Sequence, residues 1–108
     1  MHKPCAVIPV YNHEHALPVV VAALHAAGLP CVLVDDASSS SCAAVMDQLA
    51  AQPDTHLVRL PVNQGKGGAV MAGLREAARL GFADVRAFQR RFKVWTGTSP
   101  SDYRSRLL

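Results

Sequence analysis

Three short apolar runs, separated by segments long enough for a helix, constrain the fold of this chain most strongly. The runs are rich in β-branched residues and read "CAVIPV" (5–10), "PCVLVDD" (30–36) and "HLVRLPV" (56–62). Strands that are apolar on both faces are typical of a buried parallel sheet, in which a crossover helix follows each strand. The runs therefore predict three parallel strands.

Alanine and leucine at helical spacing mark the segments that follow these strands. We expect helices over 17–28, 37–52 and 69–81. Gly28 and Gly81 are placed as helix stops, and the serines of "ASSSS" are available to cap the second helix. Right-handed crossovers would put helices on the faces of the sheet. The predicted fold class is α/β, with a three-stranded parallel, Rossmann-like βαβαβα unit over residues 1–82.

The polar segments directly after the strands are "YNHE" (11–14), "DDASS" (35–39) and "NQGKGG" (63–68). Because the carboxyl ends of parallel strands meet at one edge of a sheet, we expect a ligand there. Asp35 and Asp36 end a buried strand, where adjacent charges need partners. They either accept hydrogen bonds from ribose hydroxyls and a base N–H, or one of them caps the next helix.

The "NQGKGG" segment combines glycines at 65, 67 and 68 with Lys66 before a predicted helix. Glycine lets backbone N–H groups approach an anion closely, and a helix N-terminus favours negative charge. The spacing matches neither the P-loop nor the dinucleotide fingerprint. A tight strand-to-helix turn is the alternative interpretation.

Taken in order, "VIPVYNHEHAL", "VLVDDASSS" and "LPVNQGKGGAVMAGLREAARLGF" resemble the amino-terminal half of family 2 glycosyltransferases of the GT-A fold, a group that includes dolichyl-phosphate-mannose-synthase-like enzymes. The resemblance covers about residues 4–82. It implies that the protein binds a nucleotide-diphosphate sugar, UDP- or GDP-linked. It implies that Asp35 and Asp36 contact the base and ribose. The other implied nucleotide-site residues are Pro9, Tyr11, Asn12, Glu14, Asn63, Gly65 and Lys66.

The same family is expected to use Mg²⁺ or Mn²⁺, held on the diphosphate by an Asp-x-Asp motif, and a further carboxylate as base. No Asp-x-Asp occurs in these 108 residues. Without such groups the leaving diphosphate is poorly neutralised and the acceptor is not activated. The sequence therefore predicts a catalytically incomplete binding protein, with no catalytic residue assigned and no metal site. A site formed by His13, Glu14 and His15 is a weak alternative, because one segment rarely supplies all ligands.

The last residues differ in charge from the rest of the chain. Residues 1–82 hold five Lys or Arg and six Asp or Glu, whereas residues 83–108 hold six Lys or Arg and two Asp. We expect residues 83–108 to form two short helices, the first capped by Asp84. Its apolar stripe would be Phe88, Phe92 and Trp95.

The segment "GFADVRAFQRRFKVWTGTSPSDYR" resembles the carboxy-terminal end of AraC-type helix-turn-helix domains, with residues 76–82 as the seam of a truncated or chimeric fusion. This resemblance implies the alternative function, weak duplex DNA binding through Arg86, Arg90 and Arg91. In a third interpretation, the tail helices only cover a sheet edge that a fourth strand would otherwise pair.

Cysteine usage and hydropathy bear on the compartment. Cys5, Cys31 and Cys42 are odd in number and lack the spacing of metal ligands, which favours reduced, buried thiols. The longest apolar stretch, around residues 17–30, is too short to cross a bilayer. We therefore expect a cytoplasmic protein with no transmembrane segment.

Overall fold

A computed structural model describes residues 4–87, except for the side chain of Lys66. The chain alternates strands and helices throughout this range. In chain order, the elements are β1 (Pro4–Val10), α1 (Leu17–Ala26), β2 (Cys31–Asp35), α2 (Ser40–Ala50), β3 (Thr55–Arg59), α3 (Gly65–Arg79) and β4 (Asp84–Ala87).

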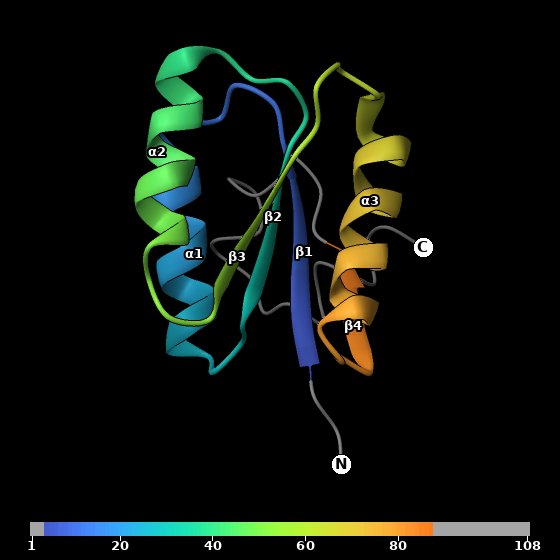
Figure 1. Cartoon of the computed structure of the whole chain (residues 1–108). Helices are drawn as coiled ribbons and strands as arrows, with labels where there is room; N and C mark the ends of the chain where they lie inside the picture. The colour runs from blue at the N-terminus through green and yellow to red at the C-terminus, as the bar shows by residue number, and fades with distance from the viewer. Residues whose placement is uncertain (1–3, 88–108) are drawn as a thin grey trace, which may run out of the picture.

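All four described strands are parallel and lie in one sheet in the order β3-β2-β1-β4. The helices α1 and α2 cover one face of the sheet, and α3 covers the other (Figure 1). This arrangement confirms the predicted α/β fold with its three helices. The crossovers through α1 and α2 were predicted, and the crossover through α3 comes with the additional strand β4, because consecutive parallel strands need a helix to return the chain. None of the helices within residues 4–87 is long and apolar enough to cross a membrane.

Side chains at alternate positions of β1 and β2 pack into two separate hydrophobic cores, one on each face of the sheet. Ile8 and Leu33 pack with α1 and α2 in one cluster, whereas Val7 and Val34 pack with α3 in the other. This alternation follows from the two-residue period of a strand. It explains why both strands are apolar at nearly every position, as the sequence predicts for strands buried on both faces.

Both glycine stops are confirmed, and both have the same geometry. Gly28 and Gly81 have φ angles of 77° and 90°, in the left-handed region that glycine adopts without a steric penalty. In each case, the next amide returns to the helix, from Leu29 to the Leu24 carbonyl and from Phe82 to the Ala77 carbonyl. These bonds form the Schellman pattern that satisfies the last helical carbonyls.

The structure corrects two boundaries. Residues 84–87 form β4, so the helix predicted to begin at Asp84 is wrong there, and the sheet has four strands instead of three. β4 pairs with the edge of β1. In the third interpretation of the tail, helices were expected to cover this edge. Val85 packs into the α3 core, and this burial outweighs the helical pattern of the tail. Phe88, Phe92 and Trp95 lie outside the described residues.

The second correction concerns the start of α3. The sequence predicts a loop over 63–68, but the helix begins at Gly65. Glycine has a low helix propensity, which is why the pattern favoured a later start. In the structure, Asn63 accepts a hydrogen bond from the Gly65 amide at 3.1 Å, and the helix forms despite its glycines.

α3 approaches the sheet closely at Gly73. A Cβ added at Gly73 would overlap Cγ1 of Val7 and lie 2.8 Å from Cγ2 of Val34. Glycine at this position is therefore required by packing, since its φ angle is not in the left-handed region.

We expect Gly73→Ala to lower the free energy of unfolding by roughly 1–3 kcal/mol, because overpacking outweighs the gain in helix propensity. Gly67→Ala is the matched control in the same helix, since a Cβ there meets nothing within 4 Å. It should leave stability unchanged or raise it by up to about 1 kcal/mol. Urea unfolding monitored by circular dichroism measures both, and equal effects of the two substitutions would contradict the packing argument.

Candidate functional site

The ends of β1, β2 and β3 meet at one edge of the sheet, at the top of Figure 1. Main-chain hydrogen bonds join these ends: the Asp36 amide donates to the Val10 carbonyl and the Leu60 amide donates to the Asp35 carbonyl, both at 2.9 Å. The three segments that the sequence predicts around a ligand are therefore adjacent, as parallel pairing requires.

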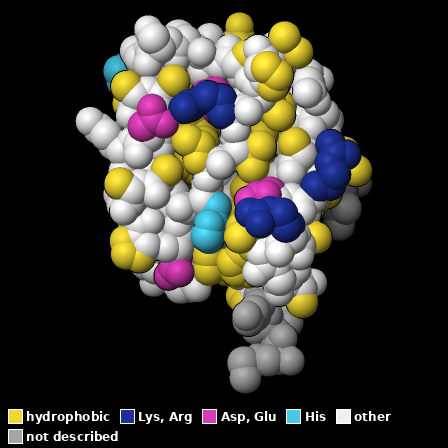
Figure 2. Space-filling model, in the orientation of Figure 1, with side chains coloured by type: hydrophobic (Ala, Val, Ile, Leu, Met, Phe, Trp, Pro, Cys, Tyr) yellow, Lys and Arg dark blue, Asp and Glu magenta, His cyan; other side chains and the backbone are white. Residues whose placement is uncertain are grey.

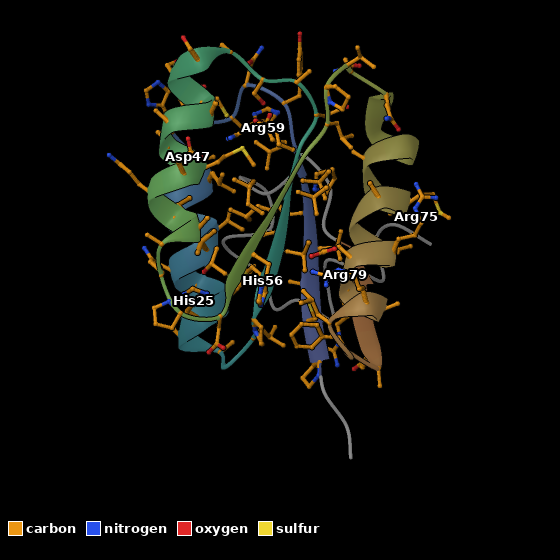
Figure 3. The ribbon with its side chains drawn as sticks, viewed as in Figure 1. His25, Asp47, His56, Arg59, Arg75 and Arg79 are labelled. Carbon is orange, nitrogen blue, oxygen red and sulfur yellow. The ribbon has the colours of Figure 1, made fainter. Side chains whose placement is uncertain are left out.

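Asp35 and Asp36 are both buried, with 1% and 4% of their surface exposed, but they serve opposite faces of the sheet. Asp35 Oδ1 accepts a hydrogen bond from the Ser38 amide at 2.8 Å, and Oδ2 accepts one from Arg59 Nε at 2.9 Å. Arg59 also contacts Asp47 Oδ1 at 3.1 Å, between β3 and α2 (Figure 3). Asp35 therefore anchors the α2 face.

Asp36 anchors the α3 face. Its Oδ1 accepts a hydrogen bond from the Gln64 amide at 2.7 Å, and its carbonyl accepts one from Asn63 Nδ2 at 3.0 Å. Asn63 in turn accepts the Gly65 amide. The segment before α3 is thus tied to the end of β2, which holds the helix N-terminus at the edge.

The loop after β1 is tied to the loop after β2. Asn12 has a left-handed φ of 58°, a conformation that asparagine tolerates better than most residues. Its amide donates to Ser38 Oγ at 3.1 Å and its Oδ1 accepts the Ser39 amide at 2.7 Å. Further along, Ser41 Oγ donates to Glu14 Oε2 at 3.0 Å. These bonds fix the loop against the start of α2.

The predicted residues differ in exposure. The side chain of Tyr11 is 45% exposed, and Asn12, Asn63 and Gly65 are also exposed, while Glu14 is partly buried. Pro9 is buried inside β1, opposite Val34. Lys66 lies in the first turn of α3, and its side chain is outside the described part of the structure.

At the carboxyl edge of the sheet, Asp35 and Glu14 have shifted pKa values. Burial alone would raise the pKa of Asp35, but the hydrogen bonds from Arg59 and Ser38 outweigh it and hold that pKa below its ordinary value. The backbone amide of Glu14 and the hydroxyl of Ser41 lower the pKa of Glu14. Both groups are ionised near neutral pH.

The cysteines and histidines do not form a metal centre in the described range. Within residues 4–87, no three His, Cys, Asp or Glu side chains converge so that they could hold a metal ion, and His13, Glu14 and His15 are no exception. The side chains of residues 4–87 therefore supply no ligand set that fits Mg²⁺ or Mn²⁺ by itself. Cys5, Cys31 and Cys42 are buried free thiols, as predicted, and burial raises the pKa of Cys5 to about 11.

The DNA-binding alternative depends on three arginines, and only Arg86 is described. It lies in β4, where its Nη2 is 3.0 Å from Asp84 Oδ2, so its predicted place on the first tail helix is wrong. Arg90 and Arg91 lie outside the described residues. On the face in Figure 2, basic side chains at the upper left and near the centre lie beside acidic ones, whereas the basic group at the right edge does not. Arg59–Asp47 and Arg79–Glu76 are ion pairs.

Arg59 and Ser38 are the residues that the sequence prediction missed. Arg59 stands directly beside Asp35 in the register of β3 and β2. The available signal was a single arginine at the end of an apolar strand, at the same strand position as a carboxylate that needed a partner. The contact of Ser38 with Asn12 had no such signal, because it depends on how two loops fold.

We expect Asp35→Asn to lower stability in a pH-dependent way. Because the pKa of Asp35 is lower in the folded chain, its carboxylate stabilises the fold above the unfolded pKa of about 3.9. This contribution is lost as pH falls through the folded pKa. Wild type should therefore exceed Asp35→Asn by about 1–3 kcal/mol at pH 7, and by progressively less below about pH 4.

Urea unfolding at several pH values measures this difference. Asp47→Asn is the control, because Asp47 touches the same arginine but its side chain is 59% exposed. It should cost at most about 1 kcal/mol. A difference between wild type and Asp35→Asn that stays constant from pH 7 to pH 3 would show that the Asp35 charge contributes nothing.

Comparison with known proteins agrees with this architecture. The family model described as "Glycosyl transferase family 2" matches residues 5–79. Three bacterial relatives carry the name undecaprenyl-phosphate 4-deoxy-4-formamido-L-arabinose transferase. The protein from Pectobacterium carotovorum is 39% identical over 79 residues, covering 66% of this chain and 24% of the relative. The protein from Photorhabdus laumondii is 35% identical over 82 residues, covering 68% and 25%.

The third relative, from Shewanella sediminis, is 39% identical over 75 residues, covering 62% of this chain and 23% of its own length. The aligned part of the chain thus spans about a quarter of each relative. The family match over residues 5–79 includes all three loops at the carboxyl edge of the sheet and ends where α3 ends. The chain therefore belongs to glycosyl transferase family 2.

Proposed function

We propose that the described unit is the donor-nucleotide half of a glycosyltransferase, and that it binds the nucleotide of a nucleotide-diphosphate sugar at the carboxyl edge of β1, β2 and β3. The observation that carries the proposal is the hydrogen-bonded convergence of these three strand ends in a family 2 chain. In open parallel sheets, ligands bind outside the carboxyl ends of the strands.

In this proposal, the base lies against the exposed ring of Tyr11. An aromatic face stacks on any base, and Asn12 and Glu14 supply polar groups beside it. Asp36 lies between the loops and accepts hydrogen bonds from the base or ribose. Both Asp35 carboxylate oxygens already accept hydrogen bonds from Ser38 and Arg59, so its contribution is indirect. Pro9 supports the loop from within β1.

The diphosphate lies at the start of α3. The first amides of a helix lack partners inside the helix and carry a partial positive charge. Gly65 and Gly67 leave open space beside the backbone, because a Cβ at either position would meet nothing within 4 Å. Asn63 and the cation of Lys66 complete the phosphate side of the proposed site.

The names of the relatives mention a sugar derivative, 4-deoxy-4-formamido-L-arabinose, and a lipid phosphate, undecaprenyl phosphate. We propose the same chemical classes for this protein: a nucleotide-linked sugar as donor and a polyprenyl phosphate as acceptor. The 108 residues contain no Asp-x-Asp motif, and no described cluster fits a divalent cation. We therefore expect this chain by itself to bind donor without transferring its sugar.

Isothermal titration with UDP, GDP and their sugar conjugates, with and without Mg²⁺, tests the proposal. We expect Tyr11→Ala to weaken binding by about 1–3 kcal/mol, roughly 5- to 150-fold in Kd, because stacking on the base is lost. Met71→Ala is the matched control, since Met71 is a large exposed side chain on α3, 52% exposed. Its Kd should equal that of wild type.

No heat and no thermal shift at millimolar nucleotide would refute the proposal. Equal weakening by Tyr11→Ala and Met71→Ala would place the nucleotide elsewhere on the protein.

A further inference from the structure

We propose that Arg59 is a positioning residue for nucleotide binding, and that it holds the Tyr11 loop through a relay formed by Asp35, Ser38 and Asn12. The inference rests on the proposed function, because it assigns Arg59 a role at that same edge. Arg59 lies on β3, and its hydrogen bonds within residues 4–87 go to Asp35, Asp47 and Ala43, which lie outside the loop that it would control. Its effect would travel through hydrogen bonds alone.

The first link is the contact between Arg59 and Asp35. Asp35 is 1% exposed, so its carboxylate has almost no water to solvate it and depends on protein partners. The guanidinium is itself held from α2, by Asp47 Oδ1 at 3.1 Å and by the Ala43 carbonyl at 3.3 Å. Arg59 therefore fixes the position of Asp35 relative to both β3 and α2.

The second link runs from Asp35 to the turn after β2. Asp35 Oδ1 accepts the Ser38 amide at 2.8 Å. Between them, Ala37 has a φ of 61°, which a residue with a Cβ adopts only when its surroundings impose it. The Asp35 carboxylate bridges this turn, and in the proposed relay it sets the place of Ser38.

The third link runs from Ser38 to the loop after β1. Ser38 Oγ donates to the Val10 carbonyl at 3.3 Å and accepts the Asn12 amide at 3.1 Å. Tyr11 lies between these two bonded residues, so a single hydroxyl holds the backbone on both sides of it. The Ser39 amide adds a bond to Asn12 Oδ1 at 2.7 Å.

The relay predicts how substitutions act on affinity. Without Arg59, the buried Asp35 carboxylate loses its cation, the strained turn at Ala37 relaxes, and Tyr11 is no longer held before the nucleotide arrives. Loss of this preorganisation weakens binding even though no contact with the ligand is removed. Because the residues act in series, breaking the relay at a second point should add little.

A double-mutant cycle on UDP and GDP affinity tests this series. We expect Arg59→Gln and Ser38→Ala each to raise Kd by roughly 2- to 30-fold. The double variant should have a Kd close to that of whichever single variant has the larger Kd. Arg59→Lys should restore part of the affinity, since an ammonium can still reach Asp35. Affinities are compared at a temperature where urea unfolding shows every variant to be folded.

Thr55→Val is the control for general loss of stability. Thr55 lies at the other end of β3, where its hydroxyl is 3.1 Å from His25 Nε2. This substitution should leave Kd unchanged. Single variants that bind like wild type, or a double variant whose loss is the product of the two single losses, would overturn the relay while the proposed function stands.

Hydrogen exchange of the free protein gives a measurement that needs no ligand. Arg59→Gln should speed exchange of the Asn12 and Ser39 amides, which are donors in the relay, whereas Thr55→Val should not. If wild type binds neither UDP nor GDP, the proposed function fails, and hydrogen exchange still decides the relay. Unchanged exchange at Asn12 and Ser39 in Arg59→Gln would refute it.

Discussion

The parallel pairing of β1 with β2 and of β2 with β3 is the constraint on which the rest of the structure depends. Parallel strands must be joined by crossover helices, so the pairing creates the two helical layers. It also brings the carboxyl ends of all three strands to one edge, where backbone hydrogen bonds join Asp36 to Val10 and Leu60 to Asp35. Fold and candidate site are therefore consequences of the same ladder of hydrogen bonds.

Because side chains alternate between the two faces of a strand, the carboxylates at the end of β2 point to opposite faces of the sheet. Asp35 follows Leu33 toward α1 and α2, where it meets Arg59, and Asp36 turns toward α3, where it meets the Gln64 amide. Buried carboxylates are costly unless they are paired and hydrogen-bonded. Here each one ties a different loop to the sheet, so hydrogen bonds within the chain hold the loops at this edge.

The family assignment and the geometry of the site give different kinds of information. The match over residues 5–79 shows which family the chain belongs to, while the hydrogen bonds show how its loops are held at the edge. β4 lies beyond the matched region, and it completes the sheet by pairing with β1. The seam expected at 76–82 contributes Ala77, Leu80 and Phe82 to the same core as β1 and β2.

The sequence by itself determined the order of strands and helices, the two glycine stops and the carboxyl edge of the sheet, because apolar period and turn residues are local properties. The strand conformation of β4 depends on tertiary structure, because its four residues have a helical pattern but pair with the open edge of β1. Tertiary structure also decided the early start of α3, where contacts from Asn63 and Asp36 overcame the low helix propensity of glycine. The pairing of Arg59 with Asp35, and of Ser38 with Asn12, depends on register and loop geometry between distant segments. The sequence places Arg59 and Asp35 at the same strand position, but it does not say that the two strands are neighbours, and no local pattern indicates the contact of Ser38 with Asn12.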